Sequence, residues 1–216
     1  MDERQKSESE QRAFFERVHE RTLNAEAAAG RIEHCLDIAG TMVRLVFAGD
    51  RLVKELLPAL FHRAVAPSME ADVTFHIWDS ETTGVVMPPP PCDRTHFTDR
   101  GDIWGFGSER FRAAFHWVEC SVNVMDRQSK TAIFWVQTAD TLPFWTRASP
   151  LRTLFQWWME MNRCQLLHAA AVGNEDGGLL LTGPGGAGKS TAWCSDATGA
   201  GCIGAERGED RKKVGE

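Results

Sequence analysis

"LLLTGPGGAGKST" (residues 179–191) is the most informative stretch of the chain, because it meets the pattern G-x-x-x-x-G-K-[ST] in full. Gly183, Gly188, Lys189 and Ser190 occupy the defining positions. An apolar run, CQLLHAAAVG, and a polar turn, NEDGG, come before it. We therefore predict a strand, a turn, a second strand and a glycine loop that opens a helix near Gly188, which is the context that a phosphate-binding loop requires.

Each residue type in this loop suits a phosphate group. Glycines let successive backbone N–H groups turn inward to form an anion-binding nest, and the following helix adds its unpaired N–H groups and the positive end of its dipole. Lys189 is expected to contact the β- and γ-phosphates, Ser190 to bind a metal ion, Mg²⁺, through its hydroxyl, and Thr191 to add a further phosphate contact. The predicted nucleotide-binding residues are Gly183, Pro184, Gly185, Gly186, Ala187, Gly188, Lys189, Ser190 and Thr191.

The stretch LLHAAAVGNEDGGLLLTGPGGAGKST resembles the region around the phosphate-binding loop of HPr serine kinase/phosphorylase C-terminal-type proteins. In that family, a strand with a His-Ala-type segment leads through a short turn into the strand before the loop. The matching residues here are His168, Ala169, Ala170, Val172 and the loop from Gly183 to Thr191. The preceding FWTRASPLRTLFQWWMEMNRCQLLHAAAV also resembles a kinase-like branch of the group. The resemblance is good over 149–191 and loose over the residues from 30 onward.

This resemblance implies a domain similar to phosphoenolpyruvate carboxykinase. It also implies ATP and Mg²⁺ as cofactors and the phosphorylation of a serine or another hydroxyl. Two other functions remain open at this point. The chain is alternatively a fragment of a transporter-type P-loop ATPase, although no L-S-G-G-Q signature or Q-loop follows the motif. It is alternatively an α+β interaction module that carries a non-functional P-loop remnant.

The sequence departs from the family after the loop, where an apolar helix and a strand ending in paired acidic residues are expected. The segment AWCSDATGAGCIGAERGEDRKKVGE (192–216) is instead rich in glycine, which costs ~1 kcal/mol relative to alanine inside a helix. Glu209 and Asp210 follow no hydrophobic strand, so we expect a solvated tail there and not metal ligands. We expect a chain that is truncated or frame-shifted after Thr191, and the sequence identifies no catalytic residue.

Composition limits the partners. A net charge of −6 and a sequence pI of about 5.7 provide no basic surface for nucleic acid. No apolar run approaches the ~18 residues of a membrane span, and the charged N-terminus lacks the apolar core of a secretory signal. The cysteines and histidines show no zinc-site spacing. We expect a cytoplasmic protein whose partners are a nucleotide and a protein or small-molecule phosphoacceptor, without nucleic acid or membrane; the oligomeric state is not indicated.

The fold class expected for the whole chain is α+β or α/β, with a mixed β-sheet and flanking helices. We expect four regions: a charged helix or tail (1–30), an α+β region (31–148), the start of an incomplete P-loop kinase-like domain (149–191) and an unpatterned glycine-rich tail (192–216). In the first, the apolar stripe is too short to distinguish a docked helix from a frayed tail, and Gly30 is a plausible stop.

Local patterns predict several elements before the motif. Alternation in CLDIAGTMVRLVFAGD and in ADVTFHIWD indicates strands, and SVNVMDRQSKTAIFWV indicates a hairpin with its turn at 126–130. RLVKELLPALFHRAV is expected to be a helix that Pro58 kinks or divides. ASPLRTLFQWWMEMN is the best helix, with Ser149 as its cap and Pro150 in its first turn. The tetraproline is expected to be a surface connector, and the tryptophans are expected to be core residues.

Overall fold

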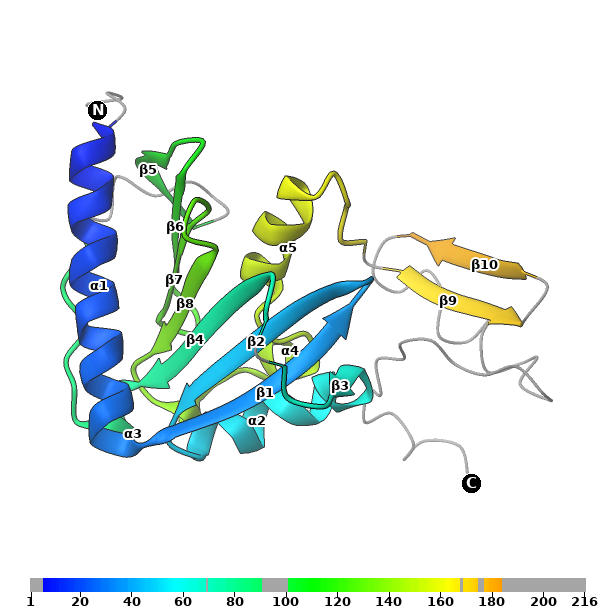
Figure 1. Cartoon of the computed structure of the whole chain (residues 1–216), viewed down its shortest axis with the longest axis horizontal. Helices are drawn as coiled ribbons and strands as arrows, with labels where there is room; N and C mark the ends of the chain where they lie inside the picture. Colours follow the sequence, from blue (N-terminus) through cyan, green and yellow to red (C-terminus); the bar gives the residue numbers. More distant parts are fainter. Residues whose placement is uncertain (1–5, 69, 91–100, 168, 175–176, 184–216) are drawn as a thin grey trace, which may run out of the picture. The chain divides into compact units, whose positions relative to one another are not determined.

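The structure is a computed structural model, and the chain divides into two compact units, Met1–Asn162 and Arg163–Glu216. Each unit is described by itself. The first unit ends later than the boundary expected at residue 149, because the last helix before Asn162 packs into its core. The structure describes residues 6–68, 70–90, 101–167, 169–174 and 177–183 (Figure 1).

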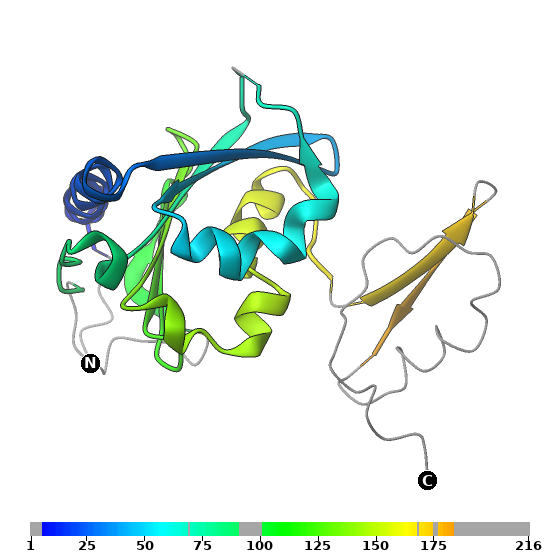
Figure 2. The same ribbon diagram turned by 90° about the horizontal axis from the view of Figure 1, so that it is seen from below.

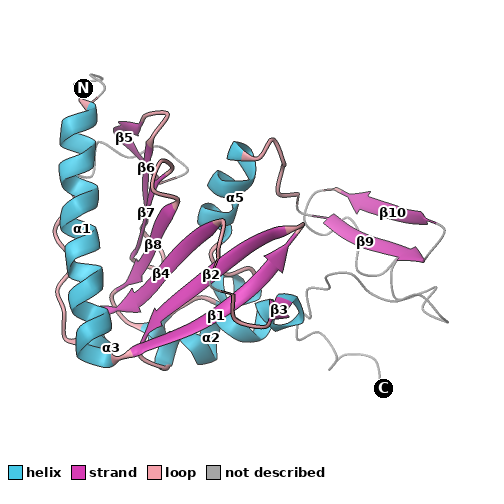
Figure 3. Cartoon of the chain, viewed as in Figure 1, coloured by secondary structure: helices cyan, strands magenta, loops and turns pink. Residues whose placement is uncertain are grey.

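The first unit is built on a mixed sheet of eight strands in the order β3-β1-β2-β4-β8-β7-β6-β5 (Figure 3). The central strand β4 pairs in parallel with both β2 and β8, and every other neighbouring pair is antiparallel. This arrangement confirms the expected mixed sheet with flanking helices. The strands are β1 (Arg31–Ile38), β2 (Thr41–Ala48), β3 (Ala64–Val65), β4 (Val73–Asp79), β5 (Asp102–Gly107), β6 (Phe111–His116), β7 (Ser121–Asp126) and β8 (Thr131–Val136).

The interior strands are buried on both faces, and most of their polar residues are buried with them. Every residue of β7 is buried, and so is every residue of β4 and β8 but one in each. The predicted hairpin is confirmed, with Asp126 opposite Thr131. In contrast, β1 was not predicted as a separate strand. It turns into β2 through Ala39 and Gly40, which have φ values of 54° and 78° and so allow the tight two-residue turn that matches strand twist.

Helix α1 (Glu8–Ala29) covers one face of the sheet, so the N-terminal segment is a docked helix. A capping box joins Ser7 and Glu10 at its start, and Gly30, with φ 84°, ends it as predicted. Two buried polar contacts attach the helix to β4. The His76 Nδ1 atom lies 2.5 Å from Glu26 Oε1, and Trp78 donates from Nε1 to the hydroxyl of Thr22 at 3.0 Å.

The opposite face of the sheet is covered by α2 (Arg51–Leu60), α4 (Phe144–Ala148) and α5 (Arg152–Met161) (Figure 2). Successive side chains of β8 alternate between the two layers: Phe134 packs in the core under α2 and α5, and Ile133 in the core under α1. Short helical turns join these elements: η1 (Phe61–Arg63), α3 (Ser80–Thr83) and η3 (Ala139–Thr141).

Two helix predictions need correction. Pro58 does not divide α2, which continues to Leu60 before a 3₁₀ turn, because one missing N–H removes only one of the bonds of the helix. Ser149 does not cap α5. Its N–H instead donates to the Trp145 carbonyl at 2.9 Å and closes α4. Helix α5 starts after Leu151, which has a left-handed φ of 57° and provides no side-chain cap.

The second unit contains an antiparallel hairpin of β9 (Ala169–Asn174) and β10 (Gly177–Thr182), in which Asn174 pairs with Gly177. This confirms the two strands expected before the glycine loop, although Cys164–Leu167 lie outside the strand and residues 175–176 of the expected turn lie outside the described residues. Leu179 and Leu180 are more than half exposed on β10.

Candidate functional site

The predicted phosphate-binding loop begins where β10 ends. Gly183 follows the last residue of that strand and is the final described residue of the chain. Pro184 to Thr191, including Lys189 and Ser190, lie outside the described residues, as do Glu209, Asp210 and His168. The phosphate and Mg²⁺ contacts of the loop therefore stay predictions. Among the described residues, no group of three or more His, Cys, Asp or Glu side chains is placed to hold a metal ion.

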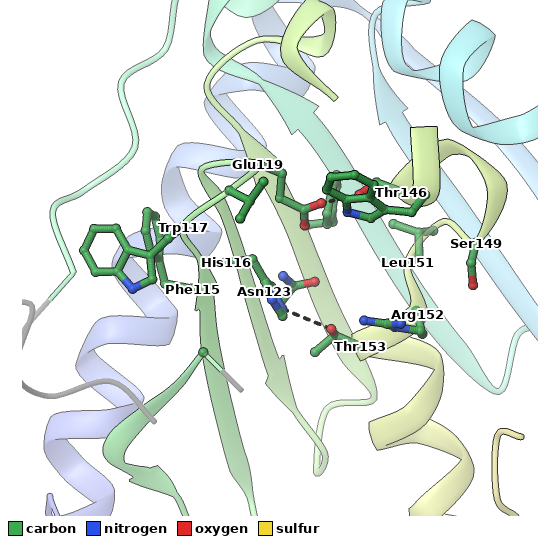
Figure 4. Close-up of a pocket in the computed structure, with 14 residues that line it drawn as sticks. Phe115, His116, Trp117, Glu119, Asn123, Thr146, Ser149, Leu151, Arg152 and Thr153 are labelled. Carbon is green, nitrogen blue, oxygen red and sulfur yellow. Dashed lines mark hydrogen bonds between the residues drawn. The ribbon is translucent and has the colours of Figure 1, made fainter. Parts of the chain in front are cut away.

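A second candidate site lies within the first unit, where a cavity of about 300 Å³ opens beside the β6–β7 turn, α4 and the start of α5 (Figure 4). None of its residues was selected from the sequence. The lining side chains are mixed: aromatic and apolar groups alternate with hydroxyl, amide, imidazole and charged groups. They are Phe115, His116, Trp117, Val118, Glu119, Asn123, Phe134, Trp145, Thr146, Ser149, Leu151, Arg152 and Thr153, with Gly101 completing the wall.

The imidazole of His116 joins β6 to α5, since its Nε2 atom lies 3.1 Å from the Thr153 hydroxyl. Burial lowers the pKa of His116, and the positive charge of Arg152 acts in the same direction, against the opposing effect of Glu119. A lowered histidine pKa favours the neutral ring at neutral pH. The ring is therefore a neutral hydrogen-bonding wall of the cavity and not a fixed positive charge.

The carboxylate of Glu119 is held by two hydroxyl groups of the protein. Ser121 donates to Oε1 at 2.6 Å, and Thr146 donates to Oε2. These bonds tie the β6–β7 turn to α4 and fix one side of the cavity. Glu119 places a carboxylate in the cavity wall, and the protein already occupies one bonding position on each of its oxygens.

Asn123 brings an amide group to the cavity. It lies in the middle of β7, is only 2% exposed, and its Nδ2 atom makes one long contact of 3.5 Å with the Ser121 hydroxyl. The amide therefore adds a donor and an acceptor to the wall of the cavity.

Arg152 provides the positive charge of the cavity. Its side chain is exposed, and no hydrogen bond or ion pair joins its guanidinium to another described residue. In Figure 4 its nitrogen atoms point toward Thr153 and Asn123. The first turn of α5 also contains no acidic residue, and the N-cap residue provides no side-chain acceptor. The positive end of the α5 helix dipole and the positive charge of the Arg152 guanidinium therefore lie at the same side of the cavity, where both attract an anion.

Two of the tryptophans depart from the core position expected for this residue type. Trp117 and Trp145 are about half exposed and line the cavity, whereas the side chains of Trp78, Trp135, Trp157 and Trp158 are buried. Phe115 stacks edge-on against Trp117, with ring centroids 4.6 Å apart. One signal in the sequence pointed to this site: Asn123 is a polar residue inside the otherwise apolar strand SVNVM.

Within the described part of the chain, no helix combines the length and the apolar character that crossing a membrane requires. Searches against protein-family models, curated proteins and solved structures find no match to this chain.

Proposed function

We propose that this chain is an ATP-binding protein of the HPr-kinase-like type, with Mg²⁺ as the second cofactor. The observation that supports the proposal is the complete G-x-x-x-x-G-K-[ST] pattern directly after strand β10, in a chain segment that folds as the expected strand pair. The chemistry of the resembled family is transfer of the γ-phosphoryl group to a serine or another hydroxyl, of a protein or a small molecule. A cytoplasmic location fits a protein that draws on cellular ATP.

The roles within the loop follow from charge and geometry. Lys189 is the point charge for the β- and γ-phosphates, Ser190 the hydroxyl ligand of Mg²⁺, and Thr191 a further phosphate donor. The glycines supply inward-facing N–H groups. Phosphoryl transfer would in addition need an acceptor-activating group, which the sequence does not identify.

A calorimetric titration of the full chain with Mg·ATP tests this proposal. Lys189→Ala removes the charge that contacts the phosphates, and Lys54→Ala is the matched control, because Lys54 is exposed on α2 and its only described ion pair is with Asp50. We expect the unaltered chain and Lys54→Ala to bind alike, Lys189→Ala to bind much more weakly, and a chelator of Mg²⁺ to reduce binding. Negligible binding by all three proteins, or equal binding by all three, would contradict the nucleotide site.

A further inference from the structure

We propose that the cavity between β6, β7, α4 and α5 binds a small amino-acid-like carboxylate with an apolar side chain. All residues of the cavity belong to the first unit, whereas the sequence of the phosphate loop belongs to the second. The proposal therefore stands independently of ATP binding.

The carboxylate is assigned to the region of Arg152. A guanidinium presents parallel N–H donors that match the two oxygens of a carboxylate, and this one has no partner among the described residues. The start of α5 adds its unpaired N–H groups and the positive end of its dipole at the same position. These groups together favour an anion at the mouth of the cavity.

The charged side chains of the cavity favour a ligand with one negative and one positive group. Glu119 contributes one negative charge to the wall, Arg152 contributes one positive charge, and His116 favours its neutral form because burial lowers its pKa. A phosphate dianion would meet one guanidinium and a nearby carboxylate, which repels it. A zwitterion places its carboxylate at the guanidinium and its ammonium group at Glu119.

The amide of Asn123 identifies the second group of the ligand. Asn123 is 2% exposed and lines the cavity, where its side-chain carbonyl oxygen is an acceptor. An N–H donor of the ligand would satisfy this oxygen, and the oxygens of Glu119 keep free lone pairs nearby that favour an amino group. A carboxylate and an N–H donor a few bonds apart are the shared feature of α-amino acids.

The apolar walls and the volume of the cavity indicate which kind of ligand side chain the cavity accommodates. Phe115, Trp145 and Leu151 supply apolar surface, and aromatic walls suit a flat or branched apolar group. The volume of about 300 Å³ lies at the lower end of the range for small-molecule sites, which is roughly 300–1,000 Å³. The cavity thus has room for a single amino acid.

The probe for this site is L-phenylalanine, and L-phenylalaninamide is the matched molecule without the carboxylate. Titration of the full chain, followed by ligand-observed NMR, is expected to show binding of the acid and at least about tenfold weaker binding of the amide. L-Leucine and L-methionine extend the test to other apolar side chains. Failure of all three amino acids to bind at millimolar concentration would overturn the proposal, as would equal affinity for acid and amide.

Two arginine variants locate the binding. Arg152→Gln is expected to weaken binding of L-phenylalanine about tenfold or more, whereas Arg21→Gln, an equal charge change on an exposed position of α1, is expected to leave it unchanged. Thermal unfolding of both variants shows that the fold is retained. Unchanged affinity in Arg152→Gln would overturn the assignment, and tighter Arg152-dependent binding of phenyl phosphate would overturn the carboxylate class. Lys189→Ala, which disables the phosphate loop, is expected to bind L-phenylalanine normally.

Discussion

The ion pair between Arg110 and Asp126 is expected to make one of the largest single polar contributions to the stability of the first unit. The guanidinium donates from Nε and Nη2 to the two carboxylate oxygens, both at 2.8 Å. The Asp126 side chain is 4% exposed and that of Arg110 is 23% exposed. Removal of one partner costs about 3–5 kcal/mol in a buried pair and at most about 1 kcal/mol in an exposed one. For this intermediate case we expect Asp126→Asn to lower the free energy of unfolding by roughly 2–3 kcal/mol.

Urea unfolding followed by far-ultraviolet circular dichroism measures this loss. Asp126→Asn keeps an oxygen that can accept from the Gln128 N–H at the turn, so the change is aimed at the ion pair itself. Asp50→Asn is the matched control, since its carboxylate pairs with Lys54 on the open surface, and we expect almost no change in the unfolding midpoint there. Equal shifts of the midpoint in the two variants would refute the reasoning.

The pH dependence of the same comparison gives an independent test. Burial alone would raise the pKa of Asp126, but hydrogen bonds from Arg110 and the Gln128 backbone outweigh it, so the pKa is lowered. A carboxyl whose folded-state pKa is lowered stabilises the fold above its ordinary pKa, and this contribution is lost as the pH falls through the folded-state value. The stability difference between the unaltered chain and Asp126→Asn is therefore expected to be full at neutral pH and to shrink in acid. A difference that grows in acid would contradict this account.

Three other changes have defined outcomes. A fragment ending at Asn162 is expected to fold cooperatively with nearly the unfolding free energy of the first unit in the full chain, because both core clusters lie within it; loss of cooperative thermal unfolding would contradict this. Thr22→Val leaves the buried indole N–H of Trp78 without its acceptor and is expected to cost about 1–3 kcal/mol in urea unfolding, whereas Thr22→Ser is expected to cost less. Gly101→Ala places a Cβ atom 2.5 Å from the Phe115 carbonyl oxygen at a φ of 87°, so a clearly lower melting temperature is expected.

Periodicity in the sequence predicted the elements whose apolar residues repeat regularly: β2, β4, the β7–β8 hairpin and α5. It left α1 undecided because three of the positions that face the sheet are polar: Gln11, Thr22 and Glu26 are all buried. Two of these join β4 through hydrogen bonds to Trp78 and His76, and such partners are invisible until the chain is folded. Strand β1 was not predicted for a related reason. It is partly exposed, and its polar and apolar residues do not alternate regularly.

The two candidate sites differ in how far the sequence reveals them. The phosphate loop is a contiguous motif, so its proposed residues and the two strands before it, β9 and β10, could be predicted from one continuous stretch of sequence. The cavity is assembled from β6, β7, α4 and α5, whose contributing residues are separated along the chain and share no spacing rule. Arg152 would also have been counted as an ordinary surface charge, because its position beside Asn123 arises only when β7 and α5 pack together.

The parallel placement of β4 has a consequence for how the chain reaches its native state. Its neighbour β8 is distant in the sequence, since Thr74 pairs with Thr131. In contrast, the β1–β2 and β7–β8 hairpins each close over only a few residues. Local pairings form early in folding, and distant ones must first overcome the entropy of closing a long loop. The two hairpins are therefore expected to form before β4 joins them, so that the rate-limiting step is the insertion of one central strand between two preformed halves of the sheet.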